Sequence, residues 1–492
     1  PGICFVTRGP GATNASPGVH IADQDSTPLI LFVGQIDGSM REREAFQELD
    51  YRAVFGTMTK WATEIDDAAR IPEIISRAFH VATSGRPGPV VVALPEDVLT
   101  DLADVADAEP YQVTEQHPAP AQMADLAQRF AAARSPIAIL GGSRWSPEAI
   151  ADFQAFAERF DLPVAVSFRR QMLFPADHPN FAGDLGIGPN PKLLARIKES
   201  DLVLLVGGRL SEMPSQSYTL FGIPNPGRPL VHVHADPEEL GRVYRPTLAI
   251  NASPAGFCAA LKTIEPLKAP AWKGAGAAAH EAYIAWSEQP APVPGEFHPG
   301  EMVRWLRSQL PEDAIMCNGA GNYATWVHRF HRFNKFATQL APTSGSMGYG
   351  VPAAIGAKRL FPDRTVIAFA GDGCFLMNGQ DFATAVQYDL PVIVVVVDNG
   401  MYGTIRMHQE REYPGRVSAT TLKNPDFAAY AKAFGGHGER VEKTEEFAPA
   451  FERAVKSGKP AIIHCLLDPE AITPAKSLST IRAEALAAKG KH

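Results

Sequence analysis

Two short polar turns in the last third of the chain carry the residues best suited to chemistry. Asp372 stands between two glycines after one apolar run, and the pair Asp398-Asn399 precedes a glycine after the next. Asp372 offers a carboxylate oxygen and Asn399 an amide oxygen, which are ligand types that Mg²⁺ binds in proteins. The flanking glycines let the backbone approach an anion closely and present its N–H groups. These turns therefore predict a site for Mg²⁺ together with a diphosphate.

The two turns can act together only if they lie at the same edge of a sheet. The surrounding sequence predicts strands over Thr365–Phe369 and Val392–Val397, with a helix over Gly379–Tyr388 between them. Parallel strands place their carboxyl ends together, and this edge is where open α/β sheets bind ligands. The helix would direct the positive end of its dipole toward the site. A lone Gly-Asp-Gly is usually a tight turn only, but two polar turns after consecutive strands favour a binding site.

This segment resembles the signature of the thiamine-diphosphate-dependent enzymes, which has a Gly-Asp-Gly turn, a helix, a strand and then a pair usually written Asn-Asn. Asp398 stands in place of the first Asn, and the second is kept as Asn399. The resemblance implies that Asp372, Asn399 and the main-chain oxygen of Met401 hold Mg²⁺. Further cofactor-binding residues that it implies in this segment are Gly371, Gly373 and Cys374.

The upstream run APTSGSMGYGVPAAIGA also resembles this superfamily. Met347 falls where the family places a bulky apolar residue under the cofactor, and the carbonyl of Gly345 would accept from its pyrimidine amino group. A methionine at such a position otherwise fills a core. Asn322, in the run NGAGNY, is a further expected contact to the diphosphate, although a plain turn explains that run equally well.

The first part of the chain contains the run GICFVTRGPGATNASPGVHIADQDSTPLILFVGQI, which resembles the pyrimidine-binding domain of the acetolactate synthase group. Phe46 and Gln47 match family positions that face the substrate channel. His20 falls in a stretch near the active site, where it could transfer protons near pH 7, although a lone His is more often a structural hydrogen-bonding group.

The catalytic Glu of this family lies just upstream of the segment that opens this chain. Pro1 begins almost directly in an apolar strand, with no initiator Met, and this start predicts a fragment whose first segment is missing. Glu42, Glu44 and Glu48 lie downstream, and none of them fits the role of that Glu.

Alternation of strands and helices predicts an α/β fold with three doubly wound parallel-sheet domains. The expected domains are a pyrimidine-binding domain over residues 1–110, a central domain over 123–265 and a diphosphate-binding domain with a C-terminal tail over 300–492. Polar, Pro- and Ala-rich stretches separate them. Outside the site, the strands expected are Gly2–Thr7, Leu29–Gly34, Pro89–Ala93, Pro136–Leu140, Pro163–Ser167, Leu202–Val206, Leu230–His234, Ala314–Cys317 and Ala461–Leu466.

A second cofactor, FAD, is left open by the central part of the chain. Acetolactate synthase carries FAD in its central domain, where an Arg with acidic neighbours contacts the flavin. Here Arg209 follows Gly207-Gly208, but the acidic pair is replaced by Ser211-Glu212. Glycines at strand ends permit a dinucleotide and equally permit tight turns.

Composition narrows the class of protein. A net charge of −8 argues against nucleic-acid binding and against adhesion to anionic membranes. No apolar run reaches the ~18–20 residues that a membrane span needs. Five widely spaced cysteines without a CxxC pair favour reduced thiols and a cytoplasmic location. The family places its cofactor between subunits, which implies a homodimer or homotetramer.

Together these features predict a transferase or lyase of the acetolactate synthase type. By the resemblance, a 2-keto acid such as pyruvate loses CO₂, and the remaining fragment is joined to a second carbonyl compound. A 2-keto acid decarboxylase or acyloin lyase of the same superfamily is the first alternative. The second alternative is a relative that binds the cofactor without turnover.

Overall fold

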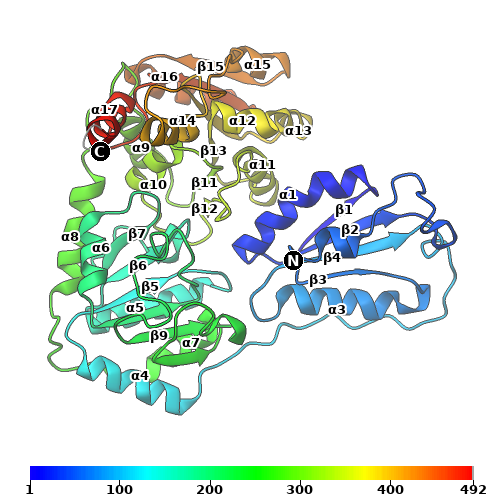
Figure 1. The fold of residues 1–492 in the computed structure, drawn as a ribbon, viewed down its shortest axis with the longest axis horizontal. Helices are drawn as coiled ribbons and strands as arrows, with labels where there is room; N and C mark the ends of the chain where they lie inside the picture. Colours follow the sequence, from blue (N-terminus) through cyan, green and yellow to red (C-terminus); the bar gives the residue numbers. More distant parts are fainter. Residues whose placement is uncertain (490–492) are drawn as a thin grey trace. The chain divides into compact units, whose positions relative to one another are not determined.

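Three sheets flanked by helices make up the fold of residues 1–489, the part of the chain that the computed structural model describes (Figure 1). The predicted α/β class with three parallel-sheet domains is confirmed. Among the described residues, no helix is both long and apolar enough to cross a membrane. The domain boundaries at 1–110, 123–265 and 300–492 stay a prediction.

The first sheet has the strand order β1-β2-β4-β3. Its strands are β1 (Gly2–Val6), β2 (Leu29–Gln35), β3 (Trp61–Glu64) and β4 (Pro89–Pro95). Ile30 and Phe32 of β2 pack in one cluster with α3 (Ile71–Thr83), whereas Leu31 and Val33 pack in another with α1 (Pro10–Asp25). Since successive strand residues point to opposite faces, helices cover both faces of this sheet, as in a doubly wound fold.

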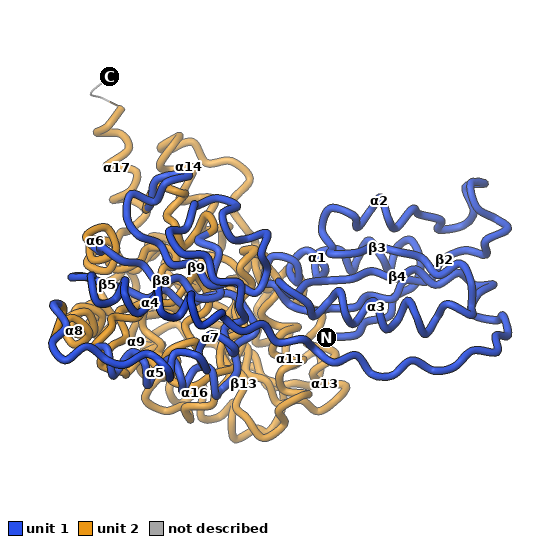
Figure 2. The backbone as a smooth tube through the Cα atoms, turned by 90° about the horizontal axis from the view of Figure 1, so that it is seen from below, with its two compact units in different colours: residues 1–160, 200–210, 221–271 blue, residues 161–199, 211–220, 272–492 orange. Residues whose placement is uncertain are grey.

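The second sheet has the order β10-β9-β8-β5-β6-β7. Its strands are β5 (Pro136–Leu140), β6 (Val164–Ser167), β7 (Phe181–Leu185), β8 (Leu202–Val206), β9 (Leu230–His234) and β10 (Leu248–Asn251). Compact packing divides the chain into two units (Figure 2). Unit 1 comprises Pro1–Phe160, Ser200–Leu210 and Phe221–Ala271, and unit 2 comprises Asp161–Glu199, Ser211–Leu220 and Trp272–His492.

The third sheet lies within unit 2 and has the order β12-β11-β13-β14-β16-β15. Its strands are β11 (Ile315–Asn318), β12 (Gln339–Leu340), β13 (Val366–Gly371), β14 (Ile393–Asp398), β15 (His437–Val441) and β16 (Ala461–Leu466). All six residues of β14 are buried, because helices cover this parallel sheet too. Strands β13 and β14 are adjacent and parallel, so Gly371 and Asp398 end at the same edge.

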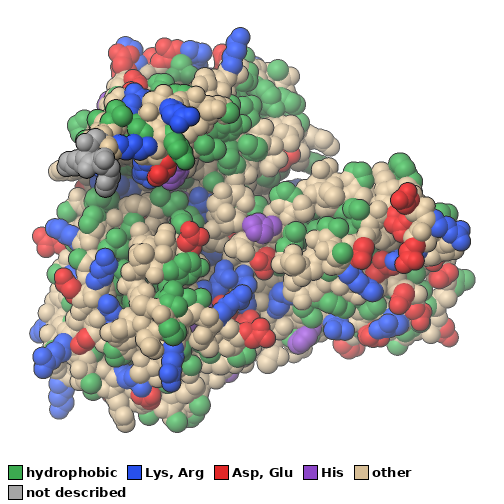
Figure 3. Space-filling view, in the orientation of Figure 1, with side chains coloured by type: hydrophobic (Ala, Val, Ile, Leu, Met, Phe, Trp, Pro, Cys, Tyr) green, Lys and Arg blue, Asp and Glu red, His purple; other side chains and the backbone are tan. Residues whose placement is uncertain are grey.

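The remaining helices complete these layers. In unit 1 they are α2 (Tyr51–Phe55), α4 (Pro120–Ala132), α5 (Pro147–Phe160) and α7 (Pro254–Ala260). In unit 2 they are α6 (Pro191–Glu199), α8 (Ala275–Ser287), α9 (Pro299–Gln309), α10 (Tyr323–Phe330), α11 (Gly350–Leu360), α12 (Asp372–Asn378), α13 (Phe382–Gln387), α14 (Gly403–Glu412), α15 (Phe427–Ala433), α16 (Thr444–Lys456) and α17 (Leu478–Lys489). Acidic and basic side chains are intermixed on the face drawn in Figure 3.

Candidate active site

A cavity of about 240 Å³ opens in unit 2 beyond the ends of β13 and β14. Its wall is mostly apolar, with Trp326 from α10 and Leu467, Ala471 and Ile472 from the segment after β16. All nine predicted cofactor-binding residues lie in this wall: Asn322, Gly345, Met347, Gly371, Asp372, Gly373, Cys374, Asn399 and Met401. The structure therefore brings the two polar turns and the upstream segment together around one cavity.

The helix after the first turn begins earlier than expected. The prediction placed it over Gly379–Tyr388, but α12 starts at Asp372 itself, directly after β13, and α13 follows a short 3-10 turn. The Gly-Asp-Gly stretch was interpreted as a separate turn, whereas Asp372 and Gly373 already have helical backbone geometry. Asp372 is consequently held by the first turn of a helix, which fixes the direction of its carboxylate.

The two glycines beside Asp372 make room for tyrosine rings. A Cβ atom on Gly371 would lie 3.0 Å from the ring of Tyr323, and one on Gly373 would lie 2.6 Å from the ring of Tyr402. The Tyr323 hydroxyl accepts from Gly319 N at 3.0 Å and lies 3.3 Å from the sulfur of Cys374. Burial raises the pKa of Tyr323 well above its usual value, so its ring contributes a neutral wall.

Asp372 faces a second carboxylate, that of Asp398. The Nδ2 group of Asn424 donates to Asp372 Oδ2 at 2.8 Å and to Asp398 Oδ1 at 2.7 Å, so that it bridges the pair. Burial, followed by the adjacent Asp398, raises the pKa of Asp372 to about 7, although hydrogen bonds from Asn424 and Gly373 oppose the shift. Burial opposes the charge on Asp398 too, but hydrogen bonds from His464 and Gly400 outweigh it and lower the pKa of Asp398. The pair thus keeps one negative charge, which favours the binding of a cation.

The residues present fit Mg²⁺ and a diphosphate. Asn424 leaves its Oδ1 buried without a hydrogen-bond partner beside the two carboxylates. Within residues 1–489 no three His, Cys, Asp or Glu side chains gather as metal ligands. A metal here would depend on Asp372, Asn399 and the carbonyl of Met401, with phosphate oxygens or water completing the octahedron that Mg²⁺ prefers. Sequence reasoning missed Asn424 and His464, although a His inside the apolar run AIIHCL required a buried partner.

Three other predicted residues have defined surroundings. The side chain of Asn322 donates to Ile472 O at 3.0 Å and accepts from Thr404 at 2.9 Å, so it ties α10 to the cavity wall. Met347 is half-buried and packs against the core of the third sheet, while Gly345 has a left-handed backbone with φ 68° and open space around it. All three residues line the cavity.

Comparison with known proteins places these features in a family. The models of the thiamine pyrophosphate enzymes match in chain order: the N-terminal TPP binding domain over residues 1–54, the central domain over 123–261 and the C-terminal TPP binding domain over 319–465. The acetolactate synthase large subunit of Corynebacterium glutamicum is 30% identical over 488 residues, which are 96% of this chain and 77% of that protein. The chain belongs to the thiamine pyrophosphate enzymes, in their acetolactate synthase-like group.

Other members of the group show the same level of similarity. Acetolactate synthase isozyme 2 large subunit of Escherichia coli is 30% identical over 483 residues, covering 95% of this chain and 84% of that protein. The probable acetolactate synthase large subunit of Methanocaldococcus jannaschii is 30% identical over 495 residues, covering 96% and 82%. The resemblance to acetolactate synthase in sequence is thus confirmed along nearly the whole chain.

The three remaining site predictions of this thiamine pyrophosphate enzyme fall in unit 1. His20 is exposed on α1, and Phe46 is 76% exposed. Gln47 has a left-handed backbone with φ 67° and packs beside Gly9, on which a Cβ atom would lie 2.8 Å from the Gln47 Cβ. Such a backbone costs a non-glycine residue about 1 kcal/mol and is often kept at functional positions. The roles of these residues stay predictions.

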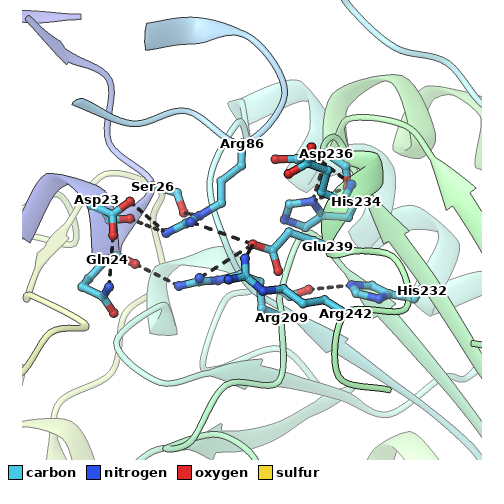
Figure 4. Close-up of polar contacts among 12 residues, drawn as sticks. Asp23, Gln24, Ser26, Arg86, Arg209, His232, His234, Asp236, Glu239 and Arg242 are labelled. Atoms are coloured by element: carbon cyan, nitrogen blue, oxygen red, sulfur yellow. Dashed lines mark hydrogen bonds and ion pairs between the residues drawn. The ribbon is translucent and has the colours of Figure 1, made fainter. Parts of the chain in front are cut away.

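FAD in the central part of the chain stays a prediction. A Cβ atom on Gly142 would lie 1.8 Å from the carbonyl oxygen of Gly207, so the two strand-end turns close on each other. Arg209 Nη2 donates to Gln24 O at 3.2 Å, and Nη1 lies 3.9 Å from Glu239 (Figure 4). The strand-end glycines therefore serve packing, and Arg209 is engaged by protein groups.

Glu239 is the centre of the polar network in Figure 4. Its side chain is only 6% exposed, and its Oε1 faces the guanidinium groups of Arg86, Arg209 and Arg242 at 3.8, 3.9 and 3.2 Å. Arg86 comes from the loop before β4, so one carboxylate joins that loop to the segment after β9. Three guanidinium groups share this carboxylate, and removing its charge would leave them to repel one another.

The substitution Glu239→Gln is expected to destabilise the protein by about 2 kcal/mol. This is less than the loss on breaking a fully buried ion pair, because the Arg242 side chain is largely exposed. Urea unfolding followed by circular dichroism would measure the loss. Glu238→Gln, at the exposed neighbouring position, is the matched control and should change stability by less than about 0.5 kcal/mol. Equal effects of the two substitutions would contradict the role of Glu239.

Proposed function

We propose that this thiamine pyrophosphate enzyme is a Mg²⁺-dependent carboligase that acts on 2-keto acids, in the manner of acetolactate synthase. One observation carries the proposal: Asp372, Asn399 and Met401 line the same apolar cavity as Met347 and Gly345. This arrangement combines ligands for a metal-bound diphosphate with an apolar surface for the cofactor ring. The names of the relatives described above, two acetolactate synthase large subunits and one probable acetolactate synthase large subunit, support the choice of reaction.

The residues of the chain have distinct tasks in this proposal. Asp372 and Asn399 would hold Mg²⁺ and through it the diphosphate, while Met347 would support the ring from below. When bound, thiamine diphosphate supplies the electron sink that makes loss of CO₂ from a 2-keto acid feasible. The side chains of Trp326 and Ile472 line the cavity and would keep water from the bound cofactor, which would strengthen the electrostatic interactions there.

The remaining parts of the proposal concern the substrate and the assembly. Phe46 and Gln47 would face the substrate, and His20 would transfer protons near it. The enzyme would work as a homodimer or homotetramer, because the family binds its cofactor between the first domain of one subunit and the third of another. Light scattering of the purified protein would give the oligomeric state, and a monomer in the presence of cofactor would contradict this part.

The test of the reaction uses purified protein with thiamine diphosphate, Mg²⁺ and pyruvate, and measures CO₂, acetolactate and acetaldehyde together. We expect one acetolactate for each CO₂ released. A matched reaction with excess chelator should release neither. CO₂ with acetaldehyde and no acetolactate would replace the carboligase by a decarboxylase. Bound cofactor without any CO₂ would favour a relative that does not turn over.

A further inference from the structure

Asp398 departs from the Asn that its family usually has, and the structure provides hydrogen-bond donors to both of its oxygens. Oδ1 accepts from Gly400 N at 2.9 Å and from Asn424 Nδ2 at 2.7 Å. Oδ2 accepts from His464 Nε2 at 2.9 Å. Only 9% of the Asp398 side chain is exposed, so these donors replace the water that a carboxylate would otherwise bind.

His464 reaches Asp398 from the neighbouring strand. It lies on β16, opposite Val396 of β14, and its side chain is 3% exposed. Its Nδ1 accepts from the backbone N–H of Phe427 at 3.3 Å, which assigns the ring proton to Nε2 and makes that atom the donor to Asp398. The ring is therefore held on both sides and cannot rotate away without losing a buried hydrogen bond.

The same set of contacts continues to the proposed metal ligand. Asn424 bridges Asp398 to Asp372, and the backbone N–H of Met401 donates to the same Asp372 Oδ2 at 3.1 Å. Two donors on one oxygen fix the rotation of the Asp372 carboxylate. His464 is thus connected to Asp372 through Asp398 and Asn424, and every member of this path is part of unit 2.

We propose that His464 and Asn424 are positioning residues of the metal site: His464 orients Asp398, and Asp398 with Asn424 orients Asp372. The inference rests on the proposed Mg²⁺ site and adds two residues to it. Asp398 and His464 form a matched pair, because the carboxylate is tolerated next to Asp372 only while a buried donor faces its outer oxygen. Loss of the donor leaves Oδ2 of a buried carboxylate unsatisfied, which favours a rotation of the carboxylate that releases Asn424.

A double-substitution cycle tests the pair. The four proteins are the wild type, His464→Leu, Asp398→Asn and the combination of both, and the readout is Mn²⁺ binding in the presence of thiamine diphosphate, followed by electron paramagnetic resonance. Loss of an outer partner of a metal ligand typically weakens metal binding by about 10- to 100-fold. We expect His464→Leu alone to weaken Mn²⁺ binding by at least about tenfold. In the Asp398→Asn variant, the same substitution should weaken Mn²⁺ binding by less than about threefold.

Conservative and matched substitutions separate positioning from a purely structural role. His464→Gln keeps an N–H donor and should hold Mn²⁺ affinity within about threefold of the wild type, whereas Asn424→Ala should weaken it about tenfold. His437→Leu is the control, because His437 makes a 2.8 Å contact with Glu439 on the adjacent strand β15, and it should leave Mn²⁺ affinity unchanged.

Each outcome decides the matter. Unchanged Mn²⁺ affinity in His464→Leu would overturn the inference while leaving the metal site intact. The same holds if His464→Leu weakens Mn²⁺ binding equally in the wild type and in the Asp398→Asn variant. A wild-type protein that binds no Mn²⁺ would overturn the proposed site and the inference together. If His464→Leu fails to fold, the double variant decides, because it lacks the stranded charge: recovery of folding and of Mn²⁺ binding supports the pairing, and failure overturns it.

Discussion

The substitution Asp372→Asn is expected to abolish metal-dependent binding of thiamine diphosphate, with a loss of affinity of at least about 100-fold. The amide keeps the size of the carboxylate and can still accept the bond from Asn424, but it provides no charge for the cation. The metal-free protein should fold normally, because burial raises the pKa of Asp372 to about 7 and already disfavours its charge. Calorimetric titration of thiamine diphosphate in excess Mg²⁺ measures the loss.

A matched control for this substitution is available at the other end of the same strand. Asp363 is exposed and precedes β13, whereas Asp372 follows it. Asp363→Asn should leave cofactor affinity within about twofold of the wild type, since surface substitutions away from a site rarely have larger effects. Unchanged affinity in Asp372→Asn would refute the metal assignment.

The second large effect is expected on stability, from Gly142→Ala. Gly142 has a left-handed backbone with φ 70°, which costs an alanine about 1 kcal/mol. The added methyl group would also lie 1.8 Å from the carbonyl oxygen of Gly207, a backbone atom that cannot rotate away. Because the ends of β5 and β8 would have to separate, we expect a total destabilisation on the order of 4 kcal/mol. Urea unfolding of the purified variant would measure it.

Gly227→Ala distinguishes the two causes. Gly227 also has a left-handed backbone, with φ 78°, but a Cβ atom there would meet no atom within 4 Å. Its substitution should therefore cost only about 1 kcal/mol, the backbone contribution alone. If Gly142→Ala were no more harmful than Gly227→Ala, the close approach of the two strand-end turns would not be a feature of the protein in solution.

The central strands of the sheets could be predicted from the sequence, whereas of the edge strands only β1 was predicted. Strands β5, β8, β9 and β16 were predicted to the residue, because buried parallel strands are made mostly of apolar residues. Five strands were missed, and each lies at the edge of its sheet: β3, β7, β10, β12 and β15. Edge strands need fewer apolar residues, as Trp61–Glu64 and His437–Val441 show.

The candidate site was predictable in the same uneven way. Asp372 and Asn399 could be identified because each directly follows a recognisable strand, so local sequence reveals its position. Asn424 comes from a loop, and His464 from a strand whose pairing with β14 no local pattern specifies. The start of α12 was placed too late because glycines beside Asp372 were interpreted as a turn rather than as space for Tyr323 and Tyr402.

The parallel pairing of β14 with β16 has a consequence for the order of events during folding. The contact between Asp398 and His464 joins residues that are 66 positions apart, and no hairpin can bring them together earlier. Chain closure over such a distance is slow compared with formation of local helices. Refolding should therefore yield helical structure before the protein gains the ability to retain its cofactor. The delay between the gain of helix and the gain of cofactor binding would measure how long this edge of the sheet takes to assemble.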